Sequence, residues 1–229
     1  MQLMKVMGKI HKWLGLIIGL QVVFWVFGGL VMSSFPIDQV HGDHLRNEIQ
    51  SKKLNVSAFY PIVELVTQCD FEVKGIVIED GFFGPQYRLT DMQNKLHFYH
   101  AKTGLVIEPL TETEALTVAK KLYSGNGKLL SQTLITQNST EYRKRIPAWR
   151  VEFDDSESAT FYIAVDNGEL MSVRNSMWRI FDFVWMLHIM DYQQRTDFNS
   201  WLLIIAAALA LVISLSGLYL VYKAFTRKH

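Results

Sequence analysis

Two long apolar stretches lie near the ends of the chain and enclose a segment in which polar and apolar residues alternate. Residues 14–35 are interrupted only by Gln21, Ser33 and Ser34, and residues 201–222 contain no charged side chain. As a helix, each 22-residue run would extend about 33 Å, enough to cross the hydrocarbon core of a bilayer. The pattern therefore predicts two transmembrane helices.

A cleaved signal peptide is the competing interpretation of the first run, because three lysines precede it. The run is longer than the apolar core of a signal peptide, and residues 35–37, Phe-Pro-Ile, do not form a small-residue cleavage site. Trp13, Trp25 and Trp201 are plausible anchors at the membrane surface. We therefore favour a membrane span.

The charges predict how the chain is oriented. The two end segments contain no acidic residue and six basic ones: Lys5, Lys9, Lys12, Lys223, Arg227 and Lys228. Because basic flanks stay on the cytoplasmic side, both termini are expected there and the intervening residues 36–200 on the other side. That part has 17 basic and 22 acidic residues, a net charge of −5, without a basic cluster. This balance argues against nucleic-acid binding.

The external part contains a duplicated pattern. Residues 87–89, 98–101 and 103–105 are echoed about 60 residues later by residues 149–151, 161–164 and 167–169. Each copy predicts an antiparallel meander. A predicted helix and strand precede each meander: 57–67 and 71–79 in the first copy, 113–123 and 128–136 in the second. Ser57 in the first helix and Thr111 or Thr113 in the second are the expected N-caps. The result is an α+β domain made of two similar units.

Residues 177–190 predict an amphipathic helix that is too short to span a membrane and carries Arg179 and Asp182. Its apolar face contains His188, and we expect this helix to lie on the outer leaflet. The fold class is thus membrane α-helical, with two transmembrane helices and an external α+β domain. The predicted segments are a cytoplasmic N-terminus at 1–13, a span at 14–35, the external domain at 36–176, an interfacial helix and linker at 177–200, a span at 201–222 and a cytoplasmic C-terminus at 223–229.

Histidines are the residues best suited to carry chemistry. His11 is followed on one helical face by Gly15 and Gly19, and a histidine above a strip without side chains can hold a flat macrocycle through its iron. The alternative is a snorkelling histidine above a glycine surface that packs against another helix. His188 is the stronger candidate, because ionisable groups at membrane depth are costly and are usually functional. A neutral imidazole beside Phe181 and Trp185 suits a b-type haem, whereas a ring bonded to backbone at the interface is the alternative.

His41 and His44 follow the first span on the predicted outer side. Three interpretations are open: they pair with His188, they lie in a solvated loop, or they form the metal site of an iron chaperone or sensor. The sequence has no nucleotide-binding, hydrolase or dithiol motif. Electrons would therefore come from a quinol, a free reduced flavin or another protein, and the acidic domain could attract ferric ions.

Several segments resemble the PepSY-associated transmembrane family: HKWLGLIIGLQ at 11–21, SSFPIDQVHGDHLR at 33–46, MWRIFDFVWMLHIMDY at 177–192, DFN at 197–199 and SGLYLVY at 216–222. The duplicated unit is similar to paired PepSY domains. The resemblance covers nearly the whole chain and is closest to a short two-span branch that contains an inner-membrane ferric reductase.

The resemblance implies a b-haem reductase in the bacterial inner membrane, with a periplasmic domain, that reduces ferric iron for uptake by a ferrous iron permease. It implies His11, His188 and His44 as haem-binding residues, with His44 or His41 as alternatives for contacting the ferric substrate. Larger relatives have at least four spans, so a homodimer would restore a four-helix bundle. His11 and His188 are expected roughly 30 Å apart at opposite membrane faces, too far to bind one iron. A non-catalytic PepSY module that binds a peptide or regulates an extracytoplasmic protease is the alternative function.

Overall fold

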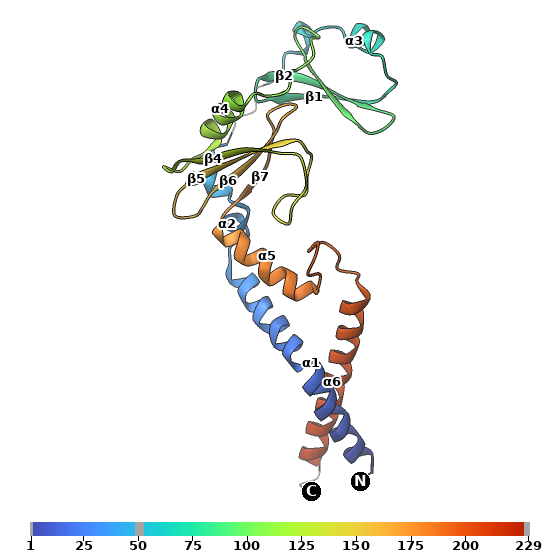
Figure 1. The fold of residues 1–229 in the computed structure, drawn as a ribbon. Helices are drawn as coiled ribbons and strands as arrows, with labels where there is room; N and C mark the ends of the chain where they lie inside the picture. The colour runs from blue at the N-terminus through green and yellow to red at the C-terminus, as the bar shows by residue number, and fades with distance from the viewer. Residues whose placement is uncertain (1, 49–52, 227–229) are drawn as a thin grey trace. The chain divides into compact units, whose positions relative to one another are not determined.

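The computed structural model describes residues 2–48 and 53–226, and the chain forms two compact units (Figure 1). The first unit contains Met1–Ile37 and Arg179–His229, and the second contains Asp38–Trp178. The boundaries of the second unit lie two residues from those of the external domain expected at 36–176. Arg227 and Lys228, which belong to the basic C-terminal flank, lie outside the described residues.

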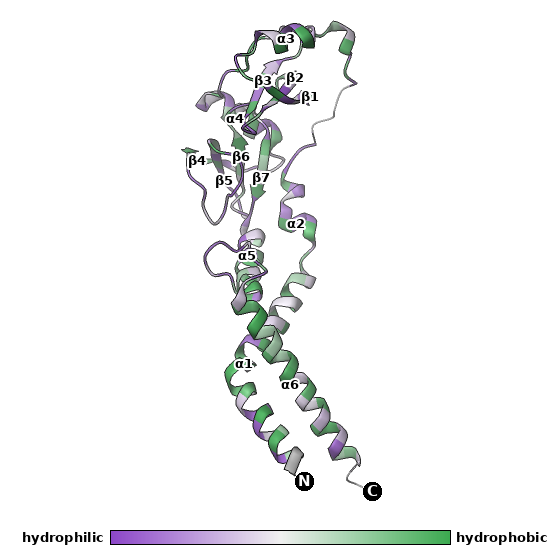
Figure 2. Ribbon diagram, turned by 90° about the vertical axis from the view of Figure 1, so that its right-hand side faces the viewer, coloured by the Kyte–Doolittle hydropathy of each residue, from purple (hydrophilic) through white to green (hydrophobic). Residues whose placement is uncertain are grey.

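The first unit contains two helices long and apolar enough to cross a membrane, as predicted. They are α1 (Gln2–Ser34) and α6 (Trp201–Thr226), which contact each other. Figure 2 shows hydrophobic residues along most of both helices. Large apolar side chains such as Leu16, which is 75% exposed, point away from the chain, as expected for a surface that faces lipid. Helix α1 begins well before residue 14 because no proline precedes the span.

The same unit holds most of α5 (Ser176–Ile189), close to the predicted 177–190. The side-chain oxygen of Asn175 accepts a hydrogen bond from the Trp178 N–H at 2.7 Å and so caps the helix start. The helix ends before Met190, whose φ of 56° is left-handed. A loop then leads to α6.

The second unit consists of two antiparallel meanders, each preceded by a helix (Figure 1). The first repeat contains α3 (Ile62–Gln68), β1 (Val73–Gly81), β2 (Gly84–Asp91) and β3 (Leu96–His100). The second contains α4 (Glu112–Leu122), β4 (Lys128–Ile135), β5 (Ala148–Asp154), β6 (Thr160–Ala164) and β7 (Leu170–Arg174). Three short helices complete it: α2 (Ile37–His41), η1 (Asp43–Leu45) and η2 (Val56–Ala58).

The two repeats differ at their last strand. In the second repeat β7 pairs with β6 over several residues, whereas in the first repeat the corresponding segment forms only the isolated bridge between Tyr99 and Val106. The duplicated helix-plus-meander pattern is therefore present, but the first sheet has three strands and the second has four.

The prediction of a helix over residues 57–67 was wrong for the first half of this segment. Residues 56–58 form the 3₁₀ turn η2, and α3 begins only after Pro61. The proline ring has no N–H and disfavours helical backbone at the residue before it, so a helix cannot run through this position without a break. Ser57 accordingly caps no α-helix, and its hydroxyl donates to the Asn55 side chain at 2.7 Å.

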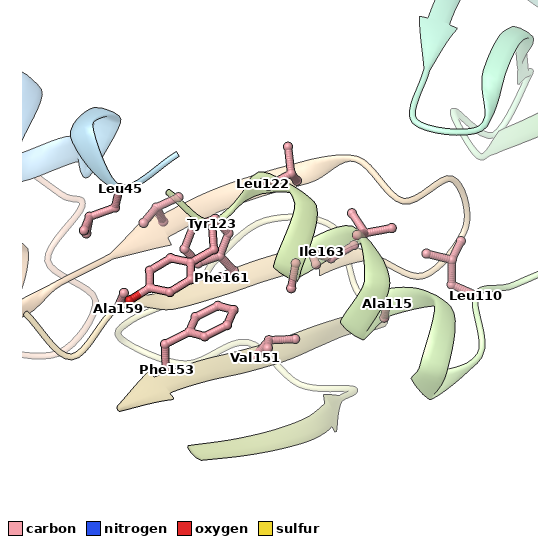
Figure 3. Close-up of a cluster of buried hydrophobic side chains, with 13 residues drawn as sticks. Leu45, Leu110, Ala115, Leu122, Tyr123, Val151, Phe153, Ala159, Phe161 and Ile163 are labelled. Carbon is pink, nitrogen blue, oxygen red and sulfur yellow. The ribbon is translucent and has the colours of Figure 1, made fainter. Parts of the chain in front are cut away.

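The largest core of the second unit lies between α4 and the second sheet (Figure 3). Phe153 stacks on Tyr123 with ring centroids 3.9 Å apart, and Phe161 meets both rings edge-on. From α4, Ala115 and three neighbouring apolar residues are buried against these rings, so the helix presents one continuous apolar face to the sheet.

The start of α4 provides a test of local stability. Thr111 accepts a hydrogen bond from the Glu114 N–H at 3.3 Å, and the Glu114 carboxylate accepts one from the Thr111 N–H at 2.9 Å. We expect Thr111→Ala to lower the free energy of unfolding of the second unit by about 1 kcal/mol, since the Glu114 N–H loses its side-chain acceptor. Thr113→Ala, in the same turn, is the matched control and should change little. Urea unfolding of the full chain in detergent, followed by tryptophan fluorescence, measures both; equal effects would contradict the capping argument.

Candidate functional site

His188 lies near the end of α5 and packs against Gly28 of α1. A Cβ built on Gly28 would lie 3.6 Å from the His188 Nδ1 and 3.2 Å from Val184 Cγ1, so only glycine leaves this space open. The Nδ1 atom is buried, and no described residue forms a hydrogen bond with either ring nitrogen. A buried polar atom without a partner is costly and calls for an explanation. The backbone-bonded ring considered as an alternative is not what the described residues form.

The rest of the His188 surroundings holds the ring in place. The Trp185 ring lies nearly parallel to the imidazole, with a 10° interplanar angle and centroids 6.5 Å apart. From α1, the Trp25 Nε1 donates to the His188 carbonyl at 2.7 Å, and the Gln21 Nε2 donates to the Leu187 carbonyl at 3.0 Å. These two donors satisfy carbonyls that a helix end leaves free.

Gln21, Trp25 and Gly28 form one face of α1 at spacings of four and three residues. Sequence reasoning treated Gln21 as an interruption of the span and Trp25 as an interfacial anchor, and it missed Gly28. The signal in the sequence was the helical spacing of these three residues inside an apolar run: a polar residue, an indole donor and a glycine.

The loop after α5 is joined to this helix through Asp182 and Trp185. Arg195 forms an ion pair with Asp182, which is largely buried, and its carbonyl accepts from the Trp185 Nε1 at 3.2 Å. The Asp191 carboxylate accepts hydrogen bonds from the N–H groups of Gln193, Gln194, Thr196 and Asp197. These backbone donors favour the charged form and lower the pKa of Asp191 to about 2. The loop is therefore ordered by fixed polar contacts.

His11 lies in the first part of α1 and faces α6. Its Nδ1 is 3.2 Å from the Ile213 carbonyl and 3.1 Å from the Ser216 Oγ. The Ser216 hydroxyl itself donates to the Ile213 carbonyl at 2.8 Å, so both oxygens accept from Nδ1, which must then carry the proton. The Nε2 atom is left with the lone pair. A histidine that donates one N–H to a carbonyl and keeps the other nitrogen bare has the arrangement usual for metal ligands.

The two histidines of the first unit are not brought together. His188 lies beside Gly28, which is 17 residues from His11 along α1, a separation of about 25 Å. At Gly15 and Gly19 an added Cβ would meet nothing within 4 Å, so the surface next to His11 is open in this chain. That space is suited to a flat ring or to a second helix.

His41 and His44 belong to the second unit, and both are exposed. The His44 Nε2 lies 2.8 Å from the Glu157 Oε2, an exposed ion pair whenever the imidazole is protonated. Among residues 2–48 and 53–226, no group of three or more His, Cys, Asp and Glu side chains is placed to hold a metal ion.

The first unit thus provides two imidazoles at separate levels. His11 has an available Nε2 and His188 has a buried Nδ1 without a partner, and both lie where glycines keep side chains away. This donor set fits haem iron, which accepts neutral imidazole as an axial ligand. Among the described residues, no carboxylate forms an ion pair with the His11 or His188 ring.

Comparison with known proteins gives one match. Neither a curated protein nor a solved structure is significantly similar to the chain. The family model described as the PepSY-associated TM region matches residues 9–229, which include most of α1, all of α6 and the whole second unit. The chain therefore belongs to the PepSY-associated transmembrane family.

Proposed function

We propose that the protein is a haem b-dependent membrane reductase that passes electrons to ferric iron at the periplasmic face and so supplies ferrous iron for uptake. The observation that carries this proposal is the buried, partnerless Nδ1 of His188 beside Gly28. Family membership and the second open histidine, His11, support it.

In this proposal His188 and His11 hold haem iron, and His44 is either a further ligand or a contact for the ferric substrate. When bound, a b-type haem supplies one-electron transfer, which the side chains of this chain cannot perform. Ser216 and the Ile213 carbonyl keep the His11 proton on Nδ1, so that Nε2 remains free. Trp25 and Trp185 fix the backbone and the ring plane at His188. His41, exposed near His44, is a weaker contact for the substrate.

The electrons are proposed to come from a quinol or a reduced flavin. Oxidation of one quinol to the quinone releases two electrons and two protons, and the electrons reduce two ferric ions to ferrous ions. Ferrous iron is the form that a divalent-metal permease can take up. The basic flanks support a bacterial inner-membrane location with both termini cytoplasmic. A homodimer would give a four-helix bundle with two copies of His188, and the open glycine surface at Gly15 and Gly19 leaves room for it.

A second function, a non-catalytic PepSY module that binds a peptide or regulates a protease, is favoured by one observation. Strand β1 is at the edge of its sheet and pairs with β2 alone among the described strands. Ile76, Val77 and Ile78 on this strand are each about 40% exposed, at 41%, 42% and 40%. An open edge with exposed apolar side chains can accept an extended peptide as an additional strand.

A visible spectrum tests the reductase proposal. We expect the full chain, produced with adequate haem supply and purified in mild detergent, to show a Soret band and a reduced α-band. His188→Ala should lose most of the haem per chain, because the buried ligand is removed. His100→Ala, on β3 of the second unit, is the control and should keep it. A colourless parent protein would reject the reductase and favour the peptide-binding module, while full haem in His188→Ala would reassign the ligand.

The glycine beside His188 gives an independent test. A side chain at Gly28 would meet Val184 at 3.2 Å and His188 at 3.6 Å, whereas one at Gly29 would meet nothing within 4 Å. We expect Gly28→Val to displace the imidazole and to lower haem content several-fold, with Gly29→Val near the parent value. The haem-to-protein ratio measures both. Equal haem content in the two variants would show that this contact does not shape the site.

Ser216 is expected to act as a positioning residue for His11. Ser216→Ala removes one of the two acceptors for Nδ1–H, and loss of such a partner typically weakens metal binding about 10-fold to 100-fold. Ser214→Ala, whose hydroxyl donates only to the Ala210 carbonyl of its own helix, is the matched control. Haem titration and redox potentiometry should show weaker binding and a shifted potential for Ser216→Ala only. No difference between the two serine variants would argue that His11 is not a haem ligand.

A further inference from the structure

Two adjacent cavities in the second unit differ in charge. The larger has a volume of about 530 Å³ and the smaller about 230 Å³, and both are lined by Asp80, Gly81 and Phe82 at the β1–β2 turn. We refer to the larger one as the lysine pocket and to the smaller one as the carboxylate pocket. The lysine pocket is within the usual size range of small-ligand sites, about 300 to 1,000 Å³.

Three lysines from separate segments line the lysine pocket. Lys53 precedes η2, Lys102 follows β3 and Lys121 lies near the end of α4. The Lys121 Nζ lies 4.9 Å from the centroid of the Phe82 ring. The apolar part of the lining is formed by Leu54, Phe59, Phe82 and Pro85. The pocket therefore combines three lysines and one carboxylate, Asp80, with a flat apolar surface.

The three ammonium groups outnumber the one carboxylate of the same lining, Asp80. Within the described part of the chain, no carboxylate forms an ion pair with Lys53, Lys102 or Lys121. Residues 36–200 as a whole have a net charge of −5, so this group of unpaired lysines differs from the domain around it. Convergent positive charge in an otherwise acidic domain favours an anionic ligand.

The carboxylate pocket has the opposite character, because its acids are already satisfied. Glu79 accepts a hydrogen bond from Gln86 at 2.8 Å and pairs with Arg88 at 3.4 Å. Glu169 pairs with Arg145 at 3.1 Å. Each of these carboxylates already pairs with an arginine of its own repeat, so it is poorly suited to binding a free ferric ion.

We propose that the lysine pocket binds ferric iron as an anionic polycarboxylate chelate. This inference rests on the proposed function for the identity of the metal, and it adds the chemical form in which the metal arrives. Ferric iron is hard and prefers oxygen ligands, so its soluble complexes include carboxylate chelates with a net negative charge. The lysine ammonium groups would donate charge-assisted hydrogen bonds to the outer carboxylate oxygens of the chelate, and the apolar lining would contact the methylene groups of the chelator.

Gallium(III) citrate is the probe, because gallium(III) resembles ferric iron in charge and ligand preference but is not reduced under these conditions. Isothermal titration of the full chain in detergent is expected to show saturable binding that weakens as salt is added, since exposed charges are screened. The triple variant Lys53→Gln, Lys102→Gln, Lys121→Gln should bind about tenfold more weakly or not at all. Lys95→Gln, Lys120→Gln, Lys128→Gln removes the same charge from exposed positions outside the pocket and should bind like the parent.

The outcomes separate this inference from the reductase proposal. Binding that is lost equally in both triple variants, or in neither, overturns the pocket assignment, even if the protein contains haem and reduces iron. Citrate alone binding as tightly as the gallium complex overturns the chelate and indicates a site for free carboxylates. Pocket-dependent chelate binding by a protein without haem supports the pocket and rejects the reductase.

Discussion

A bilayer offers no hydrogen-bond partner to a polypeptide backbone, and the first unit of this chain is organised around that constraint. Helices α1 and α6 satisfy their backbone groups internally, and the free carbonyls at the end of α5 receive the Trp25 indole and the Gln21 amide. His11 likewise bonds to α6. Against these satisfied groups, the buried Nδ1 of His188 has no described partner, and a buried group of this kind calls for an explanation.

The two repeats of the second unit differ in the size of their buried core and in the exposure of their strands. The second repeat contains the larger core, in which every residue of β6 is buried. The first repeat has a shorter helix, a single bridge in place of a fourth strand and an exposed edge at β1. Both cavities lie at the β1–β2 turn of the first repeat, and residues of the second repeat, such as Lys121 and Glu169, complete their lining. Each copy therefore has its own core, the larger one in the second repeat, and the cavities form where residues of the two repeats meet.

The charge distribution changes the picture of how iron would reach the protein. The excess of acidic residues led us to expect attraction of a bare cation, but the acids at the carboxylate pocket are occupied by Arg88 and Arg145. The lysines next to them have no described ion-pair partner. Net charge describes the domain, whereas pairing determines which charges remain available to a ligand.

The sequence by itself determined the two spans, the duplicated meander, a threonine cap at Thr111 or Thr113 and the apolar face that contains His188, because each depends on neighbours within a few residues. It also contained Pro61, which ends the helix expected at 57–67. Only the tertiary structure decided the partners of the two histidines, since Trp25 and His188 are 163 residues apart and His11 and Ser216 are 205 apart. The same holds for the lysine pocket, whose three lysines come from separate segments. Local patterns fix elements, but a site is made by side chains that only folding brings together.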